Sequence, residues 1–238
     1  MTDARPIADR ASEIRDRIAA AAARSGRDAG DVTLVAVTKT FPLSTVEAAI
    51  QAGLHDLGEN RVQELAEKAA RTPGEHAGGP VRWHLIGSLQ SNKSRDAVAL
   101  ADVVHTLDRL KLVRTLNEPA VEAGRVLPVL VQVNISGETS KHGVEPDAAH
   151  GLIAAAAEAP GLRPVGLMGM AAPATTDAER ERVVRPAFAR LRALRDAYRG
   201  PGHEALKALS MGMSGDFEIA VEEGSTHVRI GSALFGAR

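Results

Sequence analysis

A lysine follows directly after an apolar run near the start of the chain, in the stretch "LVAVTKTFP" (residues 34–42). The small and β-branched residues from Leu34 to Val37 are typical of a strand buried on both faces, because a half-exposed strand alternates polar and apolar residues. The ammonium of Lys39 at the mouth of such a strand is costly to desolvate unless it has a partner or a chemical role. Lys39 is therefore the first candidate for a chemical function.

Polar and glycine-rich stretches also follow other apolar runs. The stretches "MGMSGDF" (211–217) and "RIGSALFG" (229–236) come after the last two runs and contain Ser214, Gly231 and Ser232. Small residues at the beginning of a helix allow backbone N–H groups to approach a phosphate closely. The two segments together indicate a phosphate site, with ordinary helix N-caps as the alternative reading of both serines.

A primary amine and a phosphate cradle in one site fit pyridoxal 5′-phosphate, held as a Schiff base on Lys39. An amine with the ordinary lysine pKa of about 10.4 is almost wholly protonated at neutral pH and cannot attack an aldehyde. Apolar burial and a neighbouring cation lower that pKa and supply the free amine. Two alternatives remain open: Lys39 could serve a Schiff-base aldolase without a cofactor, or pair with a carboxylate such as Glu59.

The pattern around these residues predicts one barrel. Short apolar runs alternate with helical patterns along the chain, with no long linker, and an amphipathic helix at residues 7–24 precedes the first run. We expect an α/β protein of one domain over residues 1–238, a (β/α)8 TIM-type barrel with an extra N-terminal helix. A doubly wound open sheet is the competing fold. The barrel is favoured because the polar and glycine residues gather just after the strands, where barrel enzymes keep their chemistry.

The expected elements follow from the same periodicities. Pro186 lies inside the longest expected helix and should kink it or delay its start. The expected strands lie near 32–38, 55–59, 83–87, 102–107, 127–134, 163–170, 207–212 and 226–231. The expected helices after the first lie near 43–52, 60–71, 91–100, 108–123, 145–158, 177–199 and 215–223, with a short one after 231.

Composition excludes several classes of protein. The 238 residues carry a formal net charge of −1, so no bulk electrostatic attraction draws the chain to nucleic acid or to an anionic membrane. The absence of cysteine excludes disulfides, a thiolate nucleophile and a cysteine-ligated metal. The first twenty residues are charged throughout, and no run of about 18 apolar residues occurs that could span a bilayer. We expect a soluble, cytoplasmic protein that binds neither nucleic acid nor membrane and holds no metal.

Two other strand residues are candidates for the site. Arg229 lies in "HVRIG", where Val228 and Ile230 point toward the helices. This alternation directs Arg229 into the barrel, where it needs an acceptor; a surface strand residue is the alternative. His84 in "WHLIG" has the same geometry and suits a hydrogen-bonded core histidine equally well.

Further residues near the strand ends have structural alternatives of the same kind. Asn60 is a candidate for the site or a helix N-cap. Met168 in "GLMGM" is a candidate for the site or a packing residue. Lys141 and His142 lie in a loop next to a glycine, and we interpret that loop as solvated.

Six motifs that occur in order resemble the pyridoxal phosphate homeostasis protein family, also called proline synthetase co-transcribed homologues. The resemblance covers the chain from about residue 10 to the C-terminus. Family members are similar to the barrel domain of alanine racemase and lack that enzyme's second, β-rich domain. The motifs are "AVTKTFP", "GENRVQE", "WHLIGSLQSNK", "VNISGETSKHGV", "GLMGM" and "LSMGMSGDFEIAVEEGSTHVRIGSALFG".

The resemblance implies a pyridoxal phosphate site. Lys39 is implied to form the Schiff base with the cofactor. The phosphate is implied to be held by Ser214, Gly231 and Ser232.

The same resemblance implies that Asn60, His84 and Met168 lie around the cofactor and that Arg229 faces its pyridine nitrogen. A guanidinium cannot supply a proton there, so the ring stays neutral and is a weak electron sink. Racemisation also requires an acid or base on each face of the substrate α-carbon. The only tyrosine of the chain, Tyr198, lies at the end of an expected outer helix.

Three hypotheses for the function therefore remain. The first hypothesis is a non-enzymatic carrier or buffer of pyridoxal phosphate in vitamin B6 and amino-acid homeostasis, with apo pyridoxal phosphate enzymes as recipients. The alternative is a pyridoxal phosphate-dependent amino-acid racemase that uses His84 or a bound water as the second base. The cofactor-free aldolase is a third and weaker hypothesis. A monomer is the expected state, with a weak dimer as the alternative.

Overall fold

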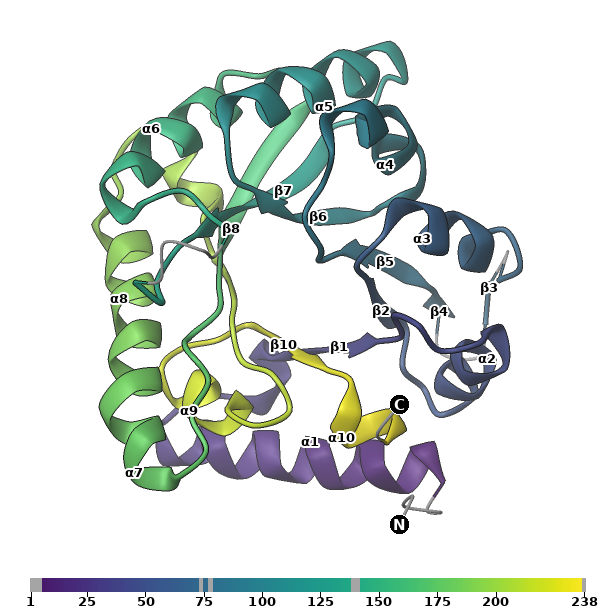
Figure 1. Cartoon of the computed structure of the whole chain (residues 1–238), viewed down its shortest axis with the longest axis vertical. Helices are drawn as coiled ribbons and strands as arrows, with labels where there is room; N and C mark the ends of the chain where they lie inside the picture. Colours follow the sequence, from purple (N-terminus) through teal and green to yellow (C-terminus); the bar gives the residue numbers. More distant parts are fainter. Residues whose placement is uncertain (1–5, 73–74, 77–78, 138–141, 237–238) are drawn as a thin grey trace.

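Eight parallel strands form a closed barrel, as the alternating pattern predicts. The computed structural model describes residues 6–72, 75–76, 79–137 and 142–236. The strands follow one another around the ring in the order β1-β10-β9-β8-β7-β6-β5-β2, which excludes the open sheet. Figure 1 shows the ring with the helices around its outside. The strands are β1 (Thr33–Val37), β2 (Asp56–Glu59), β5 (Arg82–Leu85), β6 (Val103–Leu107), β7 (Leu127–Val133), β8 (Leu162–Gly169), β9 (Ala208–Ser210) and β10 (His227–Ile230).

Helices connect the strands, and the extra N-terminal helix packs beside the two helices nearest the C-terminus. Helix α1 contacts α9 and α10, and Figure 1 shows it running past both. Its buried face includes Ala11, Ile14 and Ile18, as the spacing predicts. No helix in the described ranges is both long and apolar enough to cross a bilayer. The helices are α1 (Ile7–Arg24), α2 (Leu43–Gln51), α3 (Val62–Ala69), α4 (Ser94–Leu100), α5 (Leu110–Glu122), α6 (Pro146–Ala157), α7 (Asp177–Glu179), α8 (Arg185–Ala197), α9 (Phe217–Glu222) and α10 (Ser232–Phe235).

The longest expected helix is divided, as Pro186 predicts. A π-helical segment, Arg180–Val184, separates α7 from α8, and Pro186 occupies the second position of α8. Proline lacks an N–H and its ring crowds the carbonyl four residues earlier, so the preceding turn widens. The pattern does not predict the antiparallel pair β3 (Glu75–His76) and β4 (Gly79–Pro80), or the 3₁₀ turns Ala29–Asp31 and His203–Ala205.

The seam of the barrel brings the two ends of the chain together. Strand β1 pairs with β10, with Val35 opposite Arg229, and on its other edge with β2, with Val37 opposite Gly58. Parallel pairing places the segments that follow these strands at the same end of the barrel. The segment after β1 therefore lies between the segments that follow the second strand and the last strand of the barrel.

Apolar residues form a large layer between the barrel and its helices and a small cluster inside the ring. The inner cluster consists of Leu130, Met168 and Ala208, with partly buried neighbours. Much of the remaining interior is polar, since His105 on β6 and Ser210 on β9 are hydrogen-bonded although their strands are not neighbours. This bond crosses the inside of the barrel. The interior thus combines a short apolar layer with buried polar side chains.

Gly166 allows a test of how closely strands β8 and β9 pack against each other. A Cβ at this position would lie 2.0 Å from the carbonyl oxygen of Ala208, its neighbour on β9. Because backbone atoms cannot move aside, we expect Gly166→Ala to lower the free energy of unfolding by at least about 2 kcal/mol, measured by urea denaturation. Gly151→Ala in α6, where nothing lies within 4 Å, is the control and should be neutral or stabilising. Equal stability of the two variants would contradict this account of strand packing.

Candidate functional site

A cavity of about 700 Å³ opens at the end of the barrel where the strands finish. Six of the eight residues that the sequence indicates for the site lie in its wall. His84 and Met168 are not among the lining residues. The wall contains Val37, Lys39, Asn60, Ile86, Gly87, Ser88, Gln132, His142, Met170, Met213, Ser214, Gly215, Arg229, Gly231, Ser232 and Gly236.

Lys39 is half-buried in a sharp turn after β1. The N–H of Thr38 continues the strand pairing by donating to the carbonyl of Gly58 at 3.0 Å. Thr40 has φ of 65°, the left-handed region that residues with a Cβ rarely adopt. The Thr40 N–H donates to the carboxylate of Glu64, which holds this conformation. The backbone on both sides of Lys39 is therefore held in place.

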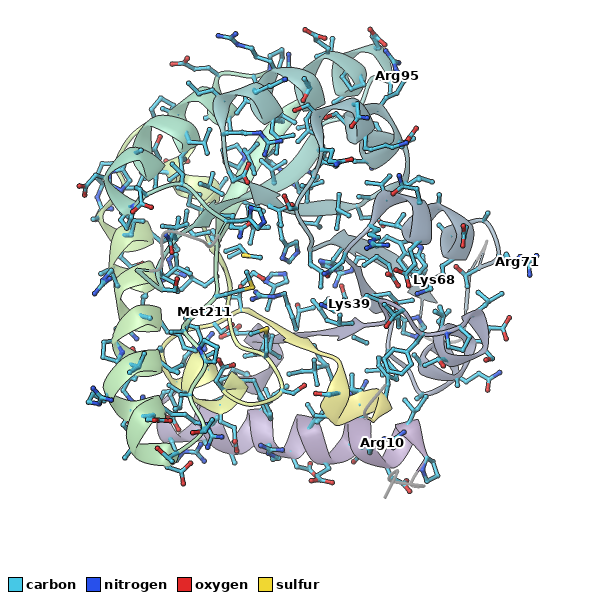
Figure 2. All side chains as sticks on the ribbon, in the orientation of Figure 1. Arg10, Lys39, Lys68, Arg71, Arg95 and Met211 are labelled. Carbon is cyan, nitrogen blue, oxygen red and sulfur yellow. The ribbon has the colours of Figure 1, made fainter. Side chains whose placement is uncertain are left out.

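A second lysine, Lys68 on α3, stabilises the same turn from outside the ring. Its Nζ lies 2.7 Å from the carbonyl oxygen of Thr38, 2.7 Å from Glu59 Oε1 and 2.9 Å from Glu64 Oε1. Thr38 Oγ1 also donates to Glu59 Oε1, at 2.6 Å. Figure 2 shows Lys39 and Lys68 on the part of the barrel near β2 and α3. Lys68 is the cation that binds Glu59, a role that the sequence does not indicate.

Burial dominates the electrostatics of this cluster. Glu59 is fully buried, and burial raises the pKa of its carboxyl group although the hydrogen bonds from Lys68 and Thr38 act in the opposite direction. Two buried charges in contact stabilise the fold only while both are present, because either one alone is desolvated without compensation. The turn that carries Lys39 thus depends on the ion pair between Lys68 and Glu59.

Arg229 points into the barrel, as the alternation along β10 predicts. Its neighbours Val228 and Ile230 are fully buried in the outer layer, while Arg229 itself is 4% exposed and lines the cavity. Its Nη1 donates to Ser210 Oγ at 2.7 Å and its Nη2 to the carbonyl of Gly169 at 3.2 Å. Burial lowers the pKa of Arg229 to about 10, so the guanidinium remains charged at neutral pH. The cavity therefore contains a buried cation.

The two serine-containing segments meet at the wall of the cavity. Helix α10 begins at Ser232 directly after Gly231, and α9 begins at Phe217, two residues after Gly215. The N–H of Ala233 donates to Ser214 Oγ at 3.3 Å, which connects the two segments. The structure therefore brings together the hydroxyl groups and glycines that the sequence indicates for a phosphate.

Asn60 and Gln132 supply amide groups to the wall. Helix α3 begins at Val62, so Asn60 is not its N-cap. We do not predict Gln132 as a site residue from the sequence, although a polar residue within the apolar run of β7 is a signal that could indicate one. Its Nε2 donates to the carbonyl of His142 at 3.1 Å, while its buried Oε1 has no hydrogen-bond partner within the described part of the chain. Lys141 lies outside the described residues.

His84 and Met168 lie in the barrel interior rather than in the cavity wall. Met168 packs with Leu130 and Ala208. His84 Nε2 lies 2.9 Å from Asp56 Oδ1, and His84 Nδ1 lies 2.9 Å from His105 Nε2. These surroundings match the packing and core alternatives, and a contact of either residue with the cofactor stays a prediction.

The closed barrel belongs to a class that a family model covering most of the chain identifies, the alanine racemase-like barrels. Residues 10–238 match the family model described as "Alanine racemase, N-terminal domain". The Pyridoxal phosphate homeostasis protein of Pseudomonas aeruginosa is 44% identical over 233 residues, which cover 98% of this chain and 96% of the relative. The chain belongs to the pyridoxal phosphate homeostasis protein family.

Solved structures with related sequences share the fold of this chain. An unknown protein from Bifidobacterium adolescentis has 39% identity and a TM-score of 0.88, with 99% of this chain and 97% of that chain covered. PipY of Synechococcus elongatus, in a structure with PLP bound, has 33% identity and a TM-score of 0.75, with 94% and 100% covered.

The ion pair that supports the Lys39 turn generates a stability prediction. Lys68→Met leaves the buried Glu59 carboxylate without its cation, so we expect a loss of about 3–5 kcal/mol in the free energy of unfolding. The double variant Lys68→Met/Glu59→Gln is the control and should recover more than half of that loss. Urea denaturation of both variants at pH 8 measures the difference.

The loss of stability in the same variant should depend on pH. Without Lys68, the pKa of Glu59, which burial already raises, should rise further, so the folded chain binds a proton that the unfolded chain lacks. Stability of Lys68→Met then decreases as the pH rises above the ordinary glutamate pKa of about 4.5, which applies to the unfolded chain. We expect the loss to be smaller at pH 5 than at pH 8. A loss independent of pH would show that Glu59 is not the source.

Proposed function

We propose that this chain binds pyridoxal 5′-phosphate in the cavity and acts as a non-catalytic carrier or buffer of the cofactor. The observation that carries the proposal is the meeting, in one cavity, of a lysine amine, a buried guanidinium and two hydroxyl-bearing segments rich in glycine. The family to which the chain belongs is named for pyridoxal phosphate, and its relative PipY has a structure with PLP bound. Both findings support the same ligand.

The residues present fit this ligand. Lys39 is the primary amine that would hold the cofactor as a Schiff base, and Ser214, Gly231 and Ser232 would hold the phosphate. Arg229 would face the pyridine nitrogen. The Oε1 of Gln132, which has no hydrogen-bond partner among the described residues, is a buried acceptor in the same wall and suits a ligand with a donor group. Bound pyridoxal phosphate supplies an aldehyde for an amine and a ring that withdraws electrons from a bound amino acid.

The arrangement of the chain's own groups favours a carrier over a racemase. Arg229 is a cation that only donates hydrogen bonds, so it favours an unprotonated pyridine nitrogen and a weak electron sink. Racemisation needs a second acid or base opposite Lys39. The hydroxyl of Tyr198 donates to the carbonyl of Pro201 at the end of α8, and His84 is hydrogen-bonded to Asp56 and His105 in the interior. Neither of these two residues lines the cavity, and His142, which does, lies at an exposed position.

A carrier also requires a recipient for the cofactor. The name of the relatives, a homeostasis protein, supports a role in distributing pyridoxal phosphate. We propose that apo pyridoxal phosphate enzymes receive it.

Lys39 is tested directly by the visible absorbance of the protein loaded with pyridoxal phosphate. Lys39→Ala should abolish the Schiff-base absorbance and the covalent retention of cofactor after borohydride reduction, with the fold intact by circular dichroism. Lys39→Arg should fail as well, because a guanidinium forms no comparable Schiff base. Lys207→Ala, at an exposed position, is the control and should behave as wild type. An unchanged spectrum in Lys39→Ala would refute the assignment.

The phosphate segments are tested with two ligands. Ser214→Ala/Ser232→Ala should weaken pyridoxal phosphate binding by about 1.5–3 kcal/mol for each lost hydrogen bond to the phosphate, measured by equilibrium titration. The loss should remain partial, because backbone N–H groups contribute to phosphate binding. Pyridoxal, which lacks the phosphate, is the control ligand and should bind equally well to both proteins. Equal losses for the two ligands would place the phosphate elsewhere.

A further inference from the structure

Five polar side chains form a continuous hydrogen-bonded chain through the barrel interior, from the cavity to the opposite end. Arg229 Nη1 lies 2.7 Å from Ser210 Oγ, which lies 2.9 Å from His105 Nδ1. His105 Nε2 lies 2.9 Å from His84 Nδ1, and His84 Nε2 lies 2.9 Å from Asp56 Oδ1. The residues come from β10, β9, β6, β5 and β2 in turn. We call this set the Arg229–Asp56 chain.

The two ends of the chain restrict its protons. A guanidinium can only donate, so Ser210 Oγ accepts from Arg229. An ionised carboxylate can only accept, so His84 Nε2 carries a proton. Burial acts to raise the pKa of Asp56, but its hydrogen bonds to His84 and Arg82 outweigh burial and lower it, which keeps the carboxylate ionised at neutral pH.

Three proton arrangements satisfy these ends. In the first, Ser210 donates to His105 Nδ1, His105 Nε2–H donates to His84 Nδ1, and both imidazoles are neutral. In the second, His105 Nδ1–H donates to Ser210, and His84 carries two protons as a cation. In the third, His105 is the cation and donates both to Ser210 and to His84 Nδ1. His84 is 1% exposed, so the second arrangement places another desolvated cation in an interior that already contains Arg229.

Burial also disfavours any extra proton in this interior. Burial holds the pKa of His105 well below its ordinary value, and the positive charge of Arg229 acts in the same direction. Burial lowers the pKa of His227, whose ring centroid lies 5.9 Å from that of His105, to about 4. The first arrangement, in which every hydrogen bond points from Arg229 toward Asp56, is therefore favoured.

We propose that Ser210, His105, His84 and Asp56 are positioning residues that orient the Arg229 guanidinium toward the ligand in the cavity. Asp56 sets the direction of the chain from the opposite end of the barrel, where it lines a second cavity of about 800 Å³. Because every hydrogen bond of the chain points toward Asp56, Ser210 Oγ always accepts from Arg229. The guanidinium therefore stays oriented toward the pyridine nitrogen of the ligand. This inference rests on the proposed function, because it assumes that pyridoxal phosphate is the ligand. The proton arrangement of the Arg229–Asp56 chain does not depend on a ligand.

The proton arrangement is tested on protein without cofactor. Nitrogen-15 NMR of labelled histidine at pH 7 should show His84 and His105 as neutral Nε2–H tautomers. A cationic His84 or an Nδ1–H tautomer of His105 would overturn the proposal. Asp56→Ala should give mixed tautomers at both histidines, whereas Arg82→Gln, which removes the other partner of Asp56, should leave them as in wild type. Unchanged tautomers in Asp56→Ala would also overturn it.

The effect on the ligand is tested with pyridoxal phosphate and with its analogue that has carbon in place of the pyridine nitrogen. Ser210→Ala should weaken pyridoxal phosphate binding roughly tenfold, the loss of one hydrogen bond to a charged group, and leave the analogue unaffected. Ser225→Ala, a buried serine bonded to neighbouring backbone carbonyls, is the control and should change neither affinity. Equal losses for both ligands would show that Ser210 maintains cavity shape only.

Failure of the proposed function gives a different result. A wild-type protein that binds neither ligand would refute the proposed cofactor site. It would also remove the ligand from this inference, while the tautomers measured without cofactor would still confirm or refute the Arg229–Asp56 chain.

Discussion

A guanidinium buried inside a closed barrel is the constraint on which much of the interior depends. The charge of Arg229 is removed from water, so its N–H groups need acceptors within the protein. Those acceptors are Ser210 and the carbonyl of Gly169. The polar side chains continue behind Ser210 as far as Asp56, and the apolar cluster inside the ring is correspondingly small. The buried cation thus determines which residues fill a space that apolar side chains usually occupy in such barrels.

The pairing of the first strand with the last strand places the buried cation close to the other candidate site residues. Pairing of β1 with β10 brings Lys39 to the cavity that contains Arg229, Gly231 and Ser232. The turn after β1 includes a residue in the left-handed region, a conformation that persists only when its surroundings hold it. Lys68 and Glu64 on α3 supply that support from outside the ring. Closure and the buried ion pair together orient the amine.

These features also explain why binding and catalysis separate in our proposal. A carrier needs an amine, a phosphate site and a stable contact for the ring nitrogen, and one end of a barrel can provide all three. A racemase additionally needs a proton donor or acceptor opposite the lysine. The interior histidines are engaged with one another and with Asp56, which suits positioning of Arg229 better than proton transfer at the cavity.

Periodicity and alternation in the sequence were enough to predict the eight barrel strands and the helices that connect them, because both are local properties, whereas the short pair β3–β4 carries no such pattern. Position after a strand likewise indicated Lys39, Ser214 and Ser232 as neighbours, since parallel strands all end on one side. Tertiary structure alone decided that Lys68 rather than Lys39 holds Glu59. It also placed His84 in the barrel interior, hydrogen-bonded to His105. Such contacts join strands and helices far apart in the chain, and the depth of a side chain in the ring depends on strand register, which no local pattern encodes.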